Sequence, residues 1–197
     1  MVKFSSVIII LAIVVHLNWD VRHLDINNAF LNGKLKETIF MHQPEGYIDP
    51  TKPNYICKLS KAIYGLKQAP RVWFDSLRGT LLKWGFQNTK SDSSLFILTG
   101  TNHIIFLLIY VDDIIVTGNN HQFLETFIKQ LNVAFSLKDL RNIQYFLGIE
   151  VHRNNSGMYL RKTKYIKDIL KKFNMETIST CPTPMMTGRQ FTTEGEQ

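Results

Sequence analysis

The sequence is poor in the residues and patterns that define several classes of protein. Its two cysteines, Cys57 and Cys181, lie far apart and form no CxxC pair, so nothing indicates a secreted disulfide scaffold and we expect reduced thiols. The six histidines are scattered without the spacing of zinc ligands. The sequence also has no internal repeat, no low-complexity block and no glycine-rich phosphate-binding loop. These absences leave a chain of ordinary globular type.

Long hydrophobic runs are missing as well. The apolar run at residues 7–15 has nine residues, which is too short to span a bilayer. With Lys3 before it, this run could be a signal peptide or an anchor for a secreted or membrane-tethered protein, but no clear small-residue cleavage site follows. The alternative is a buried helix that begins at Ser5 or Ser6 as its N-cap. We favour the buried helix and expect no signal peptide.

Acidic residues are outnumbered by basic ones. The 197 residues include 23 Lys and Arg against 16 Asp and Glu, which gives a net charge of +7 and a pI of about 9.4. This length is enough for one domain with a hydrophobic core. The positive charge suits an anionic polymer such as a nucleic acid, although many basic proteins bind none.

Residues 104–117 organise the rest of the chain. Eight apolar or aromatic residues lead into Asp112 and Asp113, and three more apolar residues follow. Both flanks resemble buried strands, and because Asp tolerates a positive φ, the two aspartates are predicted at the tip of a hairpin. A structural protein would rarely keep such a pair without a counter-charge. Mg²⁺ supplies one, and binds one or two carboxylates together with phosphate oxygens and water. The pair therefore predicts metal-assisted phosphoryl transfer and requires a third carboxylate.

Asp25 is the candidate for this third carboxylate. It lies at the end of a predicted strand over residues 21–26, and a short helical turn that Gly33 ends comes next. An aspartate at a strand end can point beyond the sheet toward the other two. The competing interpretation is that Asp25 is a simple helix N-cap.

The remaining pattern predicts an α+β chain. Strands are expected where β-branched and aromatic residues gather between turn signals, and helices where apolar residues recur every three or four positions. The expected further strands are 39–41, 56–59, 95–99, 145–153 and 158–161. The expected further helices are 70–84, 121–135 and 162–173.

The last of these helices is predicted to be amphipathic. Its apolar residues are expected to face the core, namely Tyr165, Ile166, Ile169, Leu170 and Phe173. Its lysines are expected on the outer side, where they are either simply solvated or follow a phosphate backbone. From residue 179 onward the sequence is rich in Thr, Pro, Gly and polar residues, which predicts a linker or disordered tail at 179–197.

Four stretches together carry a family resemblance. They are LDINNAFLNG at 24–33, IYGLKQAPR at 63–71, YVDD at 110–113 and YFLGIE at 145–150. In this order and at these separations, the chain resembles the reverse transcriptase of copia-type LTR retrotransposons, which is part of a Gag-Pol polyprotein. YVDD alone would be a weak match, but the four together are very specific. The similarity extends nearly to Met185.

The resemblance implies a fold and an activity. The fold would be a polymerase palm, an antiparallel sheet backed by helices, in a reverse transcriptase domain at 1–178 with the start of a thumb from about residue 162. The activity would be RNA-directed DNA polymerisation on an RNA or DNA template-primer with deoxynucleoside triphosphates. The location would be the cytoplasm, a virus-like particle or the nucleus, with no membrane partner. The resemblance does not specify an oligomeric state.

The resemblance also assigns roles to residues. Asp25 and Asp112 would hold two Mg²⁺ ions (or Mn²⁺) about 3.5–4 Å apart, and Asp113 would assist. Phe30 would be a sugar gate that excludes a 2′-hydroxyl, although a core Phe fits equally well. Further roles are nucleotide binding by Tyr64, Gly65 and Lys67, a primer grip at Leu147, Gly148 and Ile149, and nucleic-acid backbone contacts by Lys164, Lys167 and Lys171.

The match to the family is incomplete. The family has a basic, β-rich fingers segment upstream of Lys3, and neither it nor RNase H, integrase or protease sequence is present in this chain. We therefore expect truncated fingers and slow turnover. The alternative function is a catalytically inactive retrotransposon remnant that at most binds nucleic acid.

Overall fold

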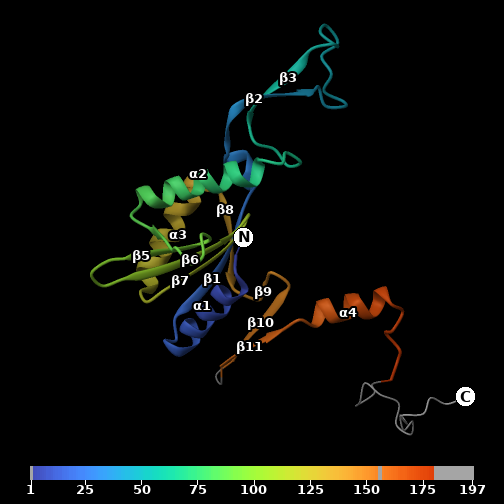
Figure 1. Ribbon diagram of the computed structural model, residues 1–197. Helices are drawn as coiled ribbons and strands as arrows, with labels where there is room; N and C mark the ends of the chain where they lie inside the picture. Colours follow the sequence, from blue (N-terminus) through green and yellow to red (C-terminus); the bar gives the residue numbers. More distant parts are fainter. Residues whose placement is uncertain (1, 155–156, 180–197) are drawn as a thin grey trace, which may run out of the picture.

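The computed structural model describes residues 2–154 and 157–179 (Figure 1). Its elements follow one another along the chain as α1 (Phe4–His16), β1 (Asp20–Ile26), the short 3₁₀ helix η1 (Ala29–Asn32), β2 (Lys34–His42), β3 (Ile56–Lys61), α2 (Ala69–Lys83), β4 (Gln87–Asn88), β5 (Leu95–Thr99), β6 (Ile104–Tyr110), β7 (Asp113–Gly118), α3 (His121–Phe135), β8 (Leu137–Asn142), β9 (Tyr145–Phe146), β10 (Ile149–Asn154), β11 (Gly157–Arg161) and α4 (Thr163–Lys172).

A six-stranded antiparallel sheet is the centre of the fold. Its strands lie in the order β4-β5-β6-β7-β1-β8, and a three-stranded sheet (β11-β10-β9) and a two-stranded ribbon (β2-β3) accompany it. The predicted hairpin of β5 and β6 is confirmed by the pairing of Thr99 with Ile104. The helix predicted at residues 121–135 is confirmed with the same bounds. The chain therefore combines antiparallel sheets and helices, as the sequence predicted.

Each face of the six-stranded sheet has its own hydrophobic core. On one face, α2 and α3 pack against side chains such as Leu107 and Val116. On the other face, α1 and the β9-β10 hairpin pack against Leu108 and Ile115. Because β6 is covered on both sides, nearly all its residues are apolar, which explains why the sequence shows a continuous run there rather than alternation.

The N-terminal helix α1 is a buried helix, as predicted. Val7, Leu11 and Val14 lie in the second core. The predicted cap is wrong, because the N-cap is Lys3 and no side chain caps the helix. The Ser6 hydroxyl instead faces inward and donates to the Asp92 carboxylate at 2.6 Å. Within the described part of the chain, α1 and the other helices are all too short or too polar to cross a membrane.

The segment that follows α3 contains more strands than the sequence predicted. The strand predicted at 145–153 is broken into β9 and β10, which pair with each other through Phe146 and Ile149. Leu147 and Gly148 form the turn between them, with φ of 50° and 81°. Two consecutive positive φ angles are typical of a tight type I′ hairpin, which a period-two pattern cannot reveal. Strand β8, which the pattern did not predict, pairs with the other side of β1.

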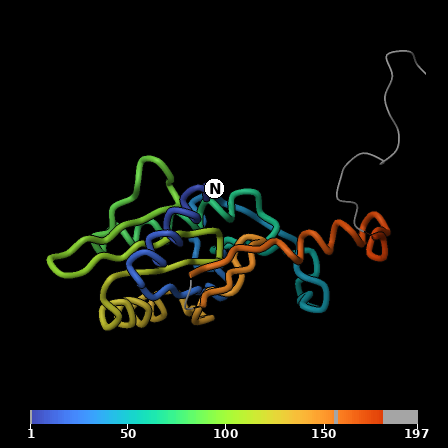
Figure 2. The backbone as a smooth tube through the Cα atoms, turned by 90° about the horizontal axis from the view of Figure 1, so that it is seen from below, coloured from blue at the N-terminus to red at the C-terminus, as the bar shows by residue number. Residues whose placement is uncertain are grey.

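The prediction for the last helix is wrong in one respect. Helix α4 forms close to the predicted bounds, but none of its described residues is buried, and Tyr165, Ile166 and Phe173 are exposed. Figures 1 and 2 show α4 extending from the end of β11, away from the six-stranded sheet. An amphipathic pattern predicts that a helix has an apolar face, but not that a partner for that face lies nearby.

The β2-β3 ribbon projects from the same end of the molecule as the start of α2 (Figure 1). Both strands are longer than the predicted 39–41 and 56–59, and the predicted loop between them is present. The predicted tail and Cys181 lie outside the described residues, apart from residue 179.

Candidate active site

The β6-β7 turn presents the adjacent aspartates. Tyr110 pairs with Asp113, so the turn has two residues, Val111 and Asp112, and Asp113 already begins β7. The sequence prediction placed the positive φ on an aspartate, and this is wrong, because Val111 carries it with φ of 56°. A positive φ at a β-branched residue is strained and persists only where neighbouring groups hold it.

Two hydrogen bonds hold this strained turn. The indole Nε1–H of Trp73 in α2 donates to the Val111 carbonyl at 2.6 Å. The amide of Ile26 in β1 donates to the Asp112 carbonyl at 2.9 Å. The position of the turn is therefore fixed by the buried Trp73 of α2 on one side and by the neighbouring strand on the other. Strained backbone held in this way is common at functional sites.

Strand pairing brings the third aspartate to the same place. Asp25 lies directly opposite Asp113 in the antiparallel register of β1 and β7. Burial raises the pKa of the Asp25 carboxyl, and the negative charges of Asp112 and Asp113 raise it further. Lys138 opposes this shift with its positive charge, and so does His23 when its ring is protonated. Three carboxylates thus repel one another at one end of the sheet, a natural arrangement for attracting a cation.

His23 engages one of these carboxylates. Its Nε2 lies 2.8 Å from Oδ1 of Asp113. The ring also meets the ring of Phe146 edge-on, with centroids 5.8 Å apart. Asp113 is therefore held by a protein side chain, whereas the Asp25 and Asp112 carboxylates have no such hydrogen bond or ion pair within the part of the chain that the structure describes.

The chemistry of the three carboxylates fits Mg²⁺, which prefers oxygen ligands. Their arrangement is not that of a preformed metal site. Within residues 2–154 and 157–179, no group of three or more His, Cys, Asp or Glu side chains lies close enough together to hold a metal ion. Because His23 pairs with Asp113, Asp25 and Asp112 are the two carboxylates that could hold an ion between them.

Two aromatic rings lie beside the carboxylates. The rings of Phe30 and Tyr64 are packed together with centroids 4.3 Å apart. Phe30 is only 8% exposed, whereas Tyr64 is 56% exposed and covers it. Partial burial raises the pKa of the Tyr64 hydroxyl, and the Asp112 and Asp25 carboxylates raise it further. Phe30 therefore packs in the core, as one interpretation predicted, and its role as a sugar gate stays a prediction.

The rest of the predicted nucleotide segment lies in the loop before α2. Gly65 has φ of 95°, a conformation that L side chains rarely adopt, and a Cβ there would meet nothing within 4 Å. Its backbone is thus open to an approaching ligand. Lys67 is exposed on the same loop.

The predicted primer grip lies next to Asp113. A cavity of about 520 Å³ is lined by Val2, His23, Tyr110, Asp113, Tyr145, Phe146, Leu147 and Gly148. The turn between β9 and β10 therefore forms one wall of the cavity, and Asp113 lies in the other wall. Ile149 lies behind the turn, buried in the second core.

The predicted backbone-contacting lysines are not gathered around this site. All three are exposed on α4. Lys164 is the nearest to the hairpin, since its backbone amide donates to the Glu150 carboxylate at 3.1 Å and its ammonium group lies 5.9 Å from the Tyr145 ring centroid. Lys167 and Lys171 follow farther along the helix, which extends outward (Figure 2).

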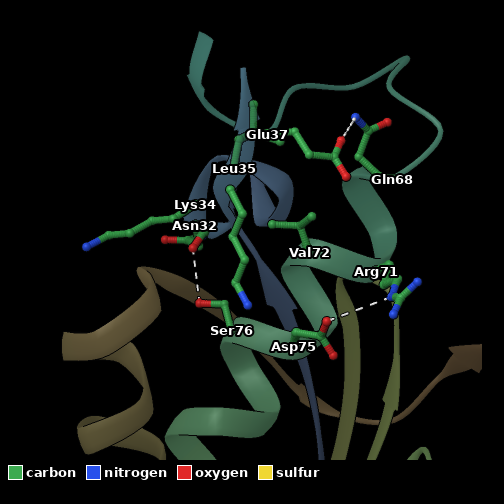
Figure 3. Close-up of a pocket in the computed structure, with 10 residues that line it drawn as sticks. Asn32, Lys34, Leu35, Glu37, Gln68, Arg71, Val72, Asp75 and Ser76 are labelled. Carbon is green, nitrogen blue, oxygen red and sulfur yellow. Dashed lines mark hydrogen bonds and ion pairs between the residues drawn. The ribbon is translucent and has the colours of Figure 1, made fainter. Parts of the chain in front are cut away.

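A separate cavity lies between the start of β2 and helix α2 (Figure 3). Its volume is about 530 Å³, and its lining contains none of the three aspartates. Gln68 donates to Glu37 at 3.3 Å across one end, and Ser76 donates to the Asn32 carbonyl at 3.1 Å across the other. Three basic and two acidic side chains line it, so its charge is nearly balanced.

Sequence reasoning missed three residues that shape the site. Trp73 falls in the helix predicted at 70–84, His23 in the strand predicted at 21–26, and Phe146 in the YFLGIE motif, but none of them was predicted to shape the site. One signal was available for His23, because it lies two positions before Asp25 on a predicted strand and so shares its face. The contact of Trp73 with Val111 has no signal in the sequence.

Comparison with known proteins identifies similar sequences. A family model described as "Reverse transcriptase (RNA-dependent DNA polymerase)" matches residues 1–187. The retrovirus-related Pol polyprotein from transposon RE1 of Arabidopsis thaliana is 47% identical over 184 residues, which is 93% of this chain and 13% of that polyprotein. The corresponding polyprotein from transposon RE2 of the same plant is 45% identical over 97% of this chain and 13% of its own length.

A more distant relative shows the same coverage. The retrovirus-related Pol polyprotein from transposon TNT 1-94 of Nicotiana tabacum is 35% identical over 187 residues, which is 93% of this chain and 14% of that polyprotein. The chain thus spans about one-eighth to one-seventh of the length of these relatives.

Proposed function

The chain belongs to the reverse transcriptase (RNA-dependent DNA polymerase) family, with copia-type Pol polyproteins among its relatives, and from this premise we propose that it catalyses RNA-directed DNA polymerisation. In this reaction a deoxynucleotide is transferred to the 3′-hydroxyl of a primer paired with a template. One observation carries the proposal: Asp25 lies opposite Asp113 in the sheet, and their charges and that of Asp112 influence one another.

The carboxylates have distinct tasks in this proposal. Asp25 and Asp112 would hold Mg²⁺, and Asp113, held by His23, contributes negative charge beside them. When bound there, Mg²⁺ would supply positive charge to the phosphate oxygens and would lower the pKa of the primer hydroxyl. The strained turn at Val111 keeps Asp112 at a fixed position, so little reorganisation is needed when substrate binds.

In this proposal, Phe30 and Tyr64 select deoxyribose over ribose in the incoming nucleotide. Phe30 and Tyr64 form a packed surface beside Asp25 and Asp112, where the ribose of an incoming nucleotide is placed next to its phosphates. A rigid aromatic surface leaves no room for a 2′-hydroxyl. The open backbone at Gly65 and the exposed Lys67 lie on the same loop and serve the base and the phosphates.

The turn between β9 and β10 is the part of the site that contacts the primer in this proposal. Leu147 and Gly148 face Asp113 across the cavity and, with Ile149 packed behind them, position the primer end mainly through backbone. The exposed lysines of α4, Lys164, Lys167 and Lys171, follow the phosphate backbone farther out. In this proposal the six-stranded sheet is a polymerase palm and α4 begins a thumb, within a domain at 1–178.

One observation favours the second candidate, a catalytically inactive remnant that at most binds nucleic acid. The described residues contain no metal cluster already assembled from three or more ligands. A remnant would keep the fold without closing the carboxylates around an ion.

Primer extension separates the two candidates. The protein is incubated with an RNA template, a labelled DNA primer, deoxynucleoside triphosphates and Mg²⁺, with a matched reaction that contains a chelator. A polymerase extends the primer only when the cation is present. Incorporation no greater than in the protein-free reaction would favour the remnant.

Removing the Asp25 charge is expected to stabilise the fold at neutral pH. Because folding raises the pKa of Asp25, its favourable protonation in the native state is fully present below the unfolded pKa and is lost as the pH rises through the folded pKa. Asp25→Asn removes the repulsion and is expected to stabilise by about 0.5–1 kcal/mol at pH 7, a gain typical of relieving strain at an active site. Thermal unfolding at pH 4 and pH 7 measures this, and the gain should shrink at pH 4.

The same experiment with Mg²⁺ tests the cation. At ten times its dissociation constant, Mg²⁺ is expected to stabilise the wild type by about 1.4 kcal/mol and Asp25→Asn much less. Asp20→Asn, at the other end of β1, serves as the control and should respond like the wild type. An equal Mg²⁺ response in Asp25→Asn would remove Asp25 from the metal site.

A further inference from the structure

His23 touches two parts of the site that are far apart in the sequence. Its Nε2 lies 2.8 Å from Oδ1 of Asp113 in β7. Its ring packs edge-on against Phe146 in β9, with an interplanar angle of 89°. The His23 side chain is only 12% exposed, against 37% for Asp113. A nearly buried side chain in two such contacts has little freedom to rotate.

These contacts enclose the cavity in which the primer end is proposed to lie. His23, Tyr110 and Asp113 come from the central sheet, and Phe146, Leu147 and Gly148 come from the β9-β10 hairpin. No backbone pairing joins the hairpin to β1 or β7 among the described strands, because it belongs to the separate sheet β11-β10-β9. Apart from the short link from β8, which pairs with β1, side-chain packing therefore sets the position of the hairpin turn relative to Asp113.

The hydrogen bond has a defined direction. A carboxylate only accepts hydrogen bonds, so His23 donates from Nε2. Without this donor, repulsion from Asp25, which lies directly opposite, would favour rotation of the Asp113 carboxylate away from its present position. His23 thus fixes Asp113 on one side and Phe146 on the other.

We propose that His23 is a positioning residue that locks the Asp113 carboxylate and the Leu147-Gly148 turn to each other, and so sets where the primer 3′ end lies relative to the carboxylates. This rests on the proposed polymerase function. Phe146, against which His23 packs, belongs to the second core, whereas Phe30 belongs to the first core on the other face of the sheet. His23 therefore affects the primer and not the incoming nucleotide.

The test compares His23→Ala with His23→Gln in steady-state primer extension. His23→Ala is expected to raise KM for the template-primer about three- to tenfold, the factor that one net hydrogen bond supports, with KM for the nucleotide unchanged. In His23→Gln the side-chain amide can donate to Asp113, so this variant is expected to recover most of the loss. A merely destabilised protein would lose active enzyme without a selective change in one KM.

The chain contains a matched control. His121 Nδ1 lies 2.6 Å from Oδ2 of Asp20 at the other end of β1, where both side chains are exposed. His121→Ala removes a similar histidine–aspartate pair far from the carboxylates and is expected to leave both KM values unchanged.

Amide hydrogen exchange without nucleic acid provides a readout independent of catalysis. His23→Ala is expected to speed exchange at residues 145–149 about three- to tenfold, and His121→Ala to leave it unchanged. If the wild type extends primers and His23→Ala keeps the wild-type KM for the template-primer, the inference is overturned and the proposed function stands. If the wild type extends no primer, the proposed function fails, and unchanged exchange in His23→Ala then overturns the inference as well.

Discussion

Replacing Asp112 with asparagine is expected to slow primer extension by about a thousandfold or more, the scale on which loss of a charged catalytic group acts. The side chain of Asp112 lies at the second position of the β6-β7 turn, near Asp25 and Tyr64. The substitution removes its charge, which the proposed site needs to hold Mg²⁺, and leaves its volume almost unchanged.

The fold is expected to tolerate this change. The structural contact of Asp112 is made by its backbone carbonyl, which accepts from the Ile26 amide at 2.9 Å and is retained in asparagine. The neighbouring bond from Trp73 to the Val111 carbonyl is likewise independent of the Asp112 side chain. The thermal unfolding temperature of Asp112→Asn should therefore be at least that of the wild type.

Single-turnover primer extension on an RNA template with Mg²⁺ measures the effect. Asp20→Asn is the matched control, because it neutralises an aspartate of the same sheet at the far end of β1 and is expected to keep the wild-type rate. Equal, low incorporation by the wild type and Asp112→Asn would show that the signal is background and would favour the inactive remnant.

Replacing Phe30 with valine is expected to raise the use of ribonucleotides relative to deoxynucleotides by about ten- to a hundredfold, the range that small changes of pocket volume support. Phe30 is 8% exposed and packs against Tyr64, which lies toward Asp25 and Asp112. Loss of the larger ring lets Tyr64 sink into the space and opens room for a 2′-hydroxyl.

Core packing must be separated from this effect, because Phe30 belongs to the first hydrophobic core. Phe30→Val is expected to cost about 2–3 kcal/mol of stability, somewhat less than truncation of a buried Phe to Ala. Phe135→Val is the control, since Phe135 is 6% exposed in the same core and packs edge-on against Trp73. It should lose similar stability without a change in sugar preference.

Competition between a ribonucleotide and the matching deoxynucleotide in primer extension measures the preference. An unchanged ratio in Phe30→Val would mean that the residue is only a core side chain, which is the other interpretation the sequence allowed.

Local patterns in the sequence predicted most elements correctly. The helix at 121–135 repeats apolar residues on one face and follows an Asn that caps it, so its bounds could be read directly. The break at Leu147 and Gly148 could not be predicted in this way, because it depends on positive φ angles that the packing of β9 on β10 imposes. The position of α4 was wrong because an apolar face was assumed to have a partner.

The candidate site likewise has some features that the sequence predicted and others that depend on tertiary contacts. The motif that contains Asp112 and Asp113 pointed to a turn between strands, but Val111, not an aspartate, takes the positive φ there. The reason lies in Trp73, whose indole holds the Val111 carbonyl from another part of the chain. The sequence placed His23 on the same strand face as Asp25. Its contact with Asp113 could not be predicted, because it depends on the register between β1 and β7.

The sequence by itself determined the family, the alternation of helices and antiparallel strands, and the three aspartates, because short motifs and apolar periodicity are local properties. Only the tertiary structure decided that Asp25 faces Asp113, that His23 holds Asp113 beside the β9-β10 turn, and that Tyr64 covers Phe30. These contacts join segments that are far apart along the chain. They depend on strand register and side-chain packing, and a shift of β1 by one residue would move His23 and Asp25 to the opposite face of the sheet.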